Sequence, residues 1–209
     1  MQRGRVLNLS RLKFTAYLKE NKILIISLAV FLIGLILGIT FLKKYDVIND
    51  FTKKYILEYI EIRNNDGFLK IFLNSFFTYI LVLLVFLIFG TSILGVVTVP
   101  IILGFCGMFF GNITSFLYSE YALKGIAFNA VIFIPSTIIF AVLLLFACRE
   151  SVNFSLKISN ITITNSVSYN LSNQFKKFLI MFLLFTGICI ISALVDAVIS
   201  SSFIKFFQF

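Results

Sequence analysis

The sequence predicts an all-α membrane protein: a bundle of about five transmembrane helices plus a short amphipathic surface helix. Of its 209 residues, 60% are hydrophobic, well above the roughly 45–50% of a soluble domain. Long uncharged segments alternate with short polar ones in which Lys and Arg collect, as they do at the edges of membrane spans. We therefore assign the net charge of +9 to contact with membrane lipid headgroups and not with nucleic acid.

The first span is expected at residues 23–42, which carry no charge. Twenty helical residues measure about 30 Å, the thickness of the hydrocarbon core. The basic segment 1–22 precedes this span, and Lys43-Lys44 follows it in place of a small-residue cleavage site. This pattern favours a retained span over a signal peptide, so residues 23–209 are predicted to form a single transmembrane domain.

Residues 43–70 are polar and are predicted to form a loop between spans. Within this loop, apolar residues recur at helical spacing over residues 46–62, with charged residues mostly on the other side. The pattern indicates an amphipathic helix. It leaves two locations open: on the membrane surface, or packed against the other spans.

The segment from Ile71 to Ser119 contains no charged residue. As one helix it would be about 74 Å long, more than twice the bilayer core, so it must fold back. We predict spans at 71–92 and 101–118, joined by a turn near 93–100. The residues that favour this turn are breakers of regular helix: Gly90, Thr91, Ser92, Gly95 and Pro100.

A short polar connector, residues 119–125, leads to the fourth predicted span at 126–148. Pro135 lies inside that span and is expected to kink it. Residues 149–177 are rich in Ser, Asn and Thr, and a hairpin or an irregular loop fits them equally well. The fifth span is predicted at 178–199.

Five spans would place the termini on opposite sides of the membrane. Segment 1–22 and loop 149–177 would then share one face with ten Lys and Arg, against eight on the face that holds loop 43–70 and the C-terminus. Because basic residues are enriched in cytoplasmic loops, we expect a cytoplasmic N-terminus, an extracytoplasmic loop 43–70 and an extracytoplasmic C-terminus.

Asp196 is a single carboxylate within the last span. Its position, about 27 Å along the helix from residue 178, is near the far interface, where it could reach water or one of three basic partners: Lys70, Lys124 or Lys205. Asp196 shares one helix face with Cys189, Ser192 and Ser200. Such stripes normally face other helices, so we favour a structural or partner-interface role over a proton relay.

Small residues also recur at spacings that permit close helix contact. Gly107 and Gly111 are four residues apart, as are Gly34 and Gly38, and Gly104 lies near the first pair. This spacing is typical of tightly packed membrane helices, and we expect internal packing more than a homo-oligomer contact. We add Gly90, Gly95, Lys124, Gly125 and Pro135 as further structural or partner-interface candidates.

The sequence offers no set of residues for catalysis. His is absent, which removes the usual general base and the commonest metal ligand. No nucleophile–base pair or Gly-rich phosphate loop is recognisable. We therefore expect no enzyme activity, no metal site and no cofactor.

The order of motifs between Phe76 and Thr137 resembles the stage II sporulation protein M family. In that family a glycine-rich turn, a glycine-rich span, a Lys-Gly connector and a proline-bearing span follow one another, ahead of a last span with a lone acid. The matching segments are GTSILG, GFCGMFFGN, ALKG, IPST and SALVDA.

The resemblance implies a role in engulfment during spore formation. Family members form a complex with the peptidoglycan-remodelling stage II sporulation proteins D and P, which they are thought to localise. The expected function is therefore a non-enzymatic membrane scaffold in which the 46–62 helix, the 119–125 connector and the Asp196 region contact partners. The alternative is a permease or transporter subunit.

Overall fold

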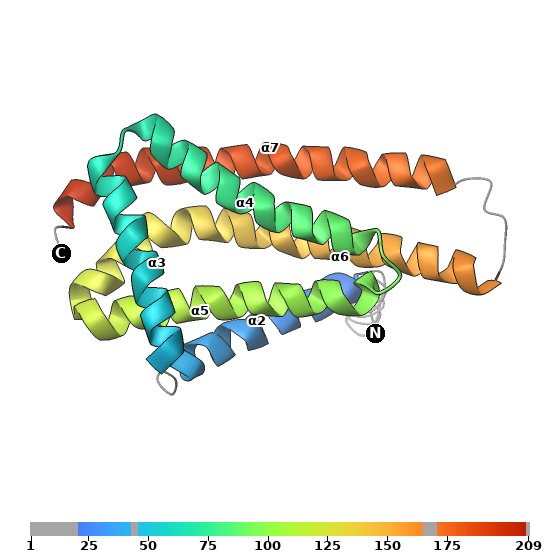
Figure 1. Cartoon of the computed structure of the whole chain (residues 1–209), viewed down its shortest axis with the longest axis horizontal. Helices are drawn as coiled ribbons and strands as arrows, with labels where there is room; N and C mark the ends of the chain where they lie inside the picture. Colours follow the sequence, from blue (N-terminus) through green and yellow to red (C-terminus); the bar gives the residue numbers. More distant parts are fainter. Residues whose placement is uncertain (1–20, 43–45, 165–170, 208–209) are drawn as a thin grey trace, which may run out of the picture.

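The computed structural model describes residues 21–42, 46–164 and 171–207, nearly all of them helical (Figure 1). The basic segment predicted at 1–22 lies almost entirely outside these residues. The elements in chain order are α2 (Lys22–Leu42), α3 (Asp46–Asn65), α4 (Phe68–Gly90), α5 (Gly95–Phe128), the π-helix η1 (Asn129–Phe133), α6 (Ile134–Thr164), α7 (Leu171–Phe203) and the short 3-10 helix η2 (Ile204–Phe206).

The all-α membrane class is confirmed, and the chain is a multi-pass membrane protein. Four helical stretches of the described residues are long and apolar enough to cross a bilayer: Lys22–Thr40, Phe68–Gly90, Gly95–Thr162 and Leu171–Phe206. The third stretch combines α5 and α6, which run side by side in opposite directions (Figure 1). Because one of the four stretches contains two helices, the bundle has five long apolar helices: α2, α4, α5, α6 and α7.

The reversal between α5 and α6 occurs within the predicted connector, at Ala122. Its backbone (φ 45°, ψ −125°) is a conformation that glycine adopts easily and an L side chain does not. Three residues later, a Cβ added to Gly125 would lie closer than 3.0 Å to the Leu117 carbonyl oxygen. The turn is therefore tight at Gly125 and strained at Ala122.

A matched pair of substitutions tests this turn. We expect Ala122→Gly to raise the free energy of unfolding by about 1 kcal/mol by removing the strain. Gly125→Ala should lower it by about 2 kcal/mol or more, because backbone must move to admit the methyl group. Denaturation in detergent micelles measures both. Equal effects of the two substitutions would contradict the described turn.

For the predicted loop 149–177, the structure differs from the prediction at residues 149–164 and 171–177, while 165–170 lie outside the described residues. In place of a hairpin or irregular loop, α6 continues to Thr164 and α7 begins at Leu171. Both helices extend past the α4–α5 turn (Figure 1). Phe154 stacks on Phe178 with ring centroids 4.5 Å apart, and Ser151 donates to the Phe86 carbonyl. These contacts between helices outweigh the low helix propensity of Ser, Asn and Thr.

Both prolines lie in helices, as was predicted for Pro135 but not for Pro100. The α4–α5 turn is shorter than predicted, occupying Thr91–Leu94, so Pro100 lies inside α5. Pro135 is the second residue of α6 and directly follows η1. In a regular helix a proline ring clashes with the carbonyl four residues earlier. For Pro135 that position lies within η1, where the wider π turn leaves more room.

Glycines bring α2 and α5 into contact along their backbones. A Cβ on Gly34, Gly38, Gly107 or Gly111 would lie closer than 3.0 Å to a carbonyl oxygen of the opposite helix. A Cβ on Gly104 would meet the Val30 side chain at 3.3 Å. The glycines predicted to mediate close packing thus lie at a contact within one chain.

Candidate functional site

Helix α3 crosses one end of the bundle instead of running along it (Figure 1). Of the two locations that the sequence left open for this amphipathic helix, the structure has the packed one. Ile56 and Ile60 are buried in a cluster with α5 and η1 residues that include Phe116, Phe128 and Ile132. Burial of these two side chains contributes about 1.5–3 kcal/mol each.

A buried ion pair joins α3 to α7. The Arg63 guanidinium contacts the Asp196 carboxylate, and each side chain is only 1% exposed. Arg63 lies on the face of α3 that carries Ile56 and Ile60, since it follows them by seven and three residues. Its position on the helix therefore directs a charge into the bundle, where it needs a partner.

Three hydroxyl groups form hydrogen bonds to the pair. Asp196 accepts hydrogen bonds from the Ser75 hydroxyl on α4, the Tyr59 hydroxyl at 3.1 Å and the Ser200 hydroxyl at 3.3 Å. Arg63 donates to Ser200 at 3.1 Å through Nε and to Ser75 at 3.1 Å through Nη2. Three helices thus meet at one cluster, which we call the Arg63–Asp196 cluster: Tyr59, Arg63, Ser75, Asp196 and Ser200.

The surroundings of the cluster keep Tyr59 neutral and Arg63 positively charged. Arg63 also lies 3.2 Å from the centroid of the Tyr59 ring, a cation–π contact. Burial raises the pKa of the Tyr59 hydroxyl well above its usual value of 10. Tyr59 therefore remains a hydrogen-bond donor at physiological pH. Burial alone would lower the pKa of Arg63, but Tyr59 and Asp196 outweigh it and raise that pKa, so Arg63 stays a cation.

The structure corrects the prediction for Asp196. We expected a carboxylate near water, paired with Lys70, Lys124 or Lys205. Instead α3 covers it and its partner is Arg63. Lys70 pairs with Asp66 at 2.8 Å, while Lys124 and Lys205 are exposed. Direct contact of Asp196 with another protein is excluded in this arrangement, because the residue is 1% exposed.

The other members of the Asp196 stripe are buried as well. Ser192 donates to the Ser136 carbonyl at 2.9 Å, and Ser200 belongs to the cluster. Two further predicted residues meet α6: a Cβ on Gly90 would lie 2.8 Å from Ser151, and one on Gly95 would lie 3.0 Å from Ser155. Among the predicted partner-interface residues, Lys124 is the one whose side chain is exposed.

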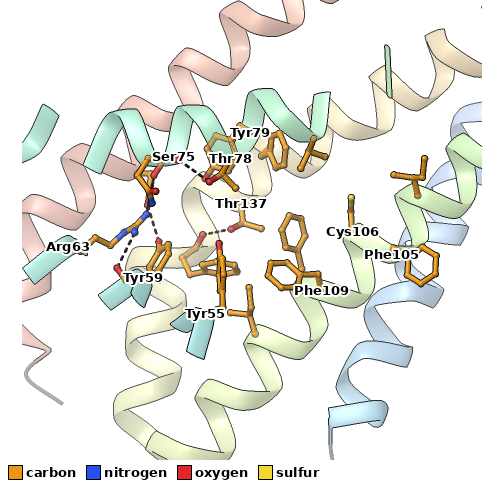
Figure 2. A pocket seen from close by; sticks show the side chains of 18 residues that line it. Tyr55, Tyr59, Arg63, Ser75, Thr78, Tyr79, Phe105, Cys106, Phe109 and Thr137 are labelled. Atoms are coloured by element: carbon orange, nitrogen blue, oxygen red, sulfur yellow. Dashed lines mark hydrogen bonds and ion pairs between the residues drawn. The ribbon is translucent and has the colours of Figure 1, made fainter. Parts of the chain in front are cut away.

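Next to the cluster is a cavity of about 280 Å³, shown in Figure 2. Its walls come from α3, α4, α5, η1, α6 and α7. Tyr59, Arg63 and Ser75 lie at one end, and Phe105 and Cys106 lie at the other (Figure 2). Tyr55 and Phe109 lie between them, with ring centroids 5.0 Å apart. The cavity is therefore polar at the α3 end and apolar farther into the bundle. No pattern in the sequence predicts this cavity.

Within the described residues, no group of three His, Cys, Asp or Glu side chains is placed to hold a metal ion. All three cysteines are free. The acid and base of the Arg63–Asp196 cluster are hydrogen-bonded to one another. The arrangement is suited to holding helices together.

Comparison with known proteins identifies the family. The model of a family described as Stage II sporulation protein M matches residues 27–201. The chain belongs to this family. The match begins in α2 and ends in α7, and so includes Arg63, Asp196 and the cavity. Membership in the stage II sporulation protein M family confirms the resemblance and makes the chain a sporulation-associated membrane protein. No curated protein and no solved structure matches the chain.

Proposed function

We propose that this protein is a non-enzymatic scaffold of the engulfment machinery. It would localise peptidoglycan-remodelling enzymes at the engulfing membrane, with α3 as the surface that presents them. The observation that carries the proposal is the attachment of α3 across the end of the bundle by the buried Arg63–Asp196 pair. A helix tied to the spans in this way keeps a fixed orientation relative to the membrane.

The outer face of α3 supports contact with a protein. Phe51 is 64% exposed and Leu57 is 48% exposed. A shallow hollow that includes Leu57 is lined by residues of both charges: Asp50, Lys53, Lys54, Glu58 and Glu61. Exposed apolar side chains with a polar, charged rim are typical of protein–protein interfaces.

The orientation of the chain favours an extracytoplasmic partner. The distribution of Lys and Arg predicts that the N-terminus is cytoplasmic, which would place α3, the 119–125 connector and the C-terminal end of α7 outside the cytoplasm. Stage II sporulation proteins D and P are the partners that the family resemblance implies. The fully hydrogen-bonded state of Asp196 supports a structural role over a catalytic or proton-carrying one.

Substitution of the outer face of α3 tests this function. We expect Leu57→Asp to reduce recovery of stage II sporulation protein D or P with the tagged chain by about tenfold or more, because a hydrophobic contact at the centre of an interface is worth about 1.4 kcal/mol or more. Leu94→Asp is the matched control. Leu94 is 69% exposed and lies in the turn at the opposite end of the bundle (Figure 1).

Equal recovery with both variants would show that α3 does not bind the partner. The competing function, a permease subunit, predicts a different result. In that case Leu57→Asp would leave partner recovery unchanged, and substitutions in the cavity would change solute flux in vesicles. A scaffold predicts no flux in any variant.

A further inference from the structure

The cavity beside the Arg63–Asp196 cluster opens toward lipid. Helices α4 and α5 are joined at the Thr91–Leu94 turn and separate toward α3 (Figure 1). Two of the side chains that line the cavity are also on the outer surface: Thr78 of α4, and Phe105 of α5, which is 61% exposed. Both helices are long and apolar enough to span the membrane, so the opening between them faces the bilayer interior.

The walls of the cavity suit a hydrocarbon chain. Val82 and Ile102 line it together with Phe105, Phe109 and Phe140. Tyr79 closes one side by stacking on Phe140 with centroids 4.3 Å apart. The volume of about 280 Å³ leaves room for several methylene groups. A cavity of about 150 Å³ already binds benzene.

The α3 end of the cavity offers hydrogen-bond donors without a free charge. Arg63 and Asp196 neutralise each other. Tyr55, one helical turn before Tyr59, and Asn74, next to Ser75, also line the cavity, and neither the Tyr55 hydroxyl nor the Asn74 amide is bonded to another side chain among the described residues. Burial raises the pKa of Tyr55, so its hydroxyl stays protonated. Neutral donors of this kind match ester oxygens better than a phosphate group, which attracts cations.

The place of the opening favours lipid over a partner helix as the occupant. An extended hydrocarbon chain is much narrower than a helix, which with its side chains is about 10 Å across. A single extended chain fits. We propose that the cavity binds one acyl chain of a membrane phospholipid, which enters between α4 and α5 and places its ester group near Tyr55 and Asn74. This inference is independent of the scaffold function.

Photocrosslinking in nanodiscs tests the proposal. The full chain is reconstituted in phosphatidylglycerol that contains a small fraction of phosphatidylglycerol with a diazirine on one acyl chain, irradiated, digested and analysed by mass spectrometry. We expect crosslinks to concentrate on Ile102, Cys106 and Val82, which line the cavity and are only partly exposed. Labelling of Leu81, a residue of α4 that is 62% exposed and outside the cavity, reports ordinary contact with bulk lipid.

Cys106→Phe narrows the cavity, and Ile101→Phe adds the same ring on the exposed side of α5, where Ile101 is 51% exposed. Removing room for two methylenes should lower cavity crosslinks by about tenfold in Cys106→Phe and leave them unchanged in Ile101→Phe. Thr78→Phe, at the exposed mouth, should give the same loss without disturbing the core. Cavity residues labelled no more than Leu81, or labelling unaffected by both Cys106→Phe and Thr78→Phe, would overturn the proposal.

Discussion

Replacing Asp196 with Asn is expected to lower the free energy of unfolding by about 3–5 kcal/mol, the cost of leaving a buried cation without its counter-ion. The substitution keeps the size of the side chain and removes its charge. Arg63 would then remain 3% exposed with neutral partners. The least costly escape is for α3 to move off the bundle so that the guanidinium reaches water.

Unfolding by SDS titration from mixed micelles measures this loss. Asp66→Asn is the matched control, because it removes one carboxylate from the Lys70–Asp66 pair, whose Lys70 side chain is 70% exposed. Exposed pairs contribute about 0–1 kcal/mol. Similar losses in the two variants would mean that the Arg63–Asp196 pair does not hold the fold together.

A double substitution that removes both charges tests whether the loss in Asp196→Asn comes from the unpaired Arg63. Well-packed apolar side chains often replace a buried ion pair at little cost, so Arg63→Met combined with Asp196→Leu should be more stable than Asp196→Asn alone. The same SDS titration checks this. Additive losses from the two single substitutions would contradict the interpretation of the cluster as one coupled unit.

Gly111→Ala is expected to be the second large effect, with a loss of about 3 kcal/mol of unfolding free energy. The added methyl group would lie closer than 3.0 Å to the Leu35 carbonyl oxygen of α2. That atom belongs to the backbone and cannot rotate away, so α2 and α5 must separate. Separation would expose the backbones that now pack along Gly34, Gly38 and Gly107.

Gly187→Ala provides the control for helix propensity. Gly187 lies in α7, and an added Cβ would have no atom within 4 Å. Replacing glycine by alanine in a helix interior normally stabilises by about 0.5–1 kcal/mol. We expect opposite signs for Gly111→Ala and Gly187→Ala in the same unfolding assay. A neutral Gly111→Ala would show that α2 and α5 are not in backbone contact.

The helices were predictable from the sequence because membrane spans require long apolar runs. The uncharged segment 71–119 had to fold back, and its glycines indicated the turn and close packing between helices, but not that the partner helix is α2. The partner of Asp196 was missed because Arg63 lies in a polar segment far away in the sequence. One signal could have found it: Arg63 continues the apolar face of Tyr59 and Ile60, where a charge needs a buried partner.

The α6–α7 extension and the cavity depend on contacts that a local pattern does not contain. Ser155 donates to the Ser92 carbonyl at 2.6 Å, a bond that turns a residue of low helix propensity into one that stabilises α6. The cavity is lined by residues of α3, α4, α5, η1, α6 and α7. The cavity exists because α4 and α5 diverge. The spacing of apolar residues within either helix does not predict the angle between the two helices.

Hydrogen–deuterium exchange of α3 in nanodiscs tests the central claim, that the Arg63–Asp196 pair holds this helix across the end of the bundle. We predict that amides of residues 55–65 are protected in the natural chain and in Asp66→Asn. In Asp196→Asn they should exchange much faster, while those of α5 remain protected. Unchanged protection of α3 in Asp196→Asn would contradict the claim.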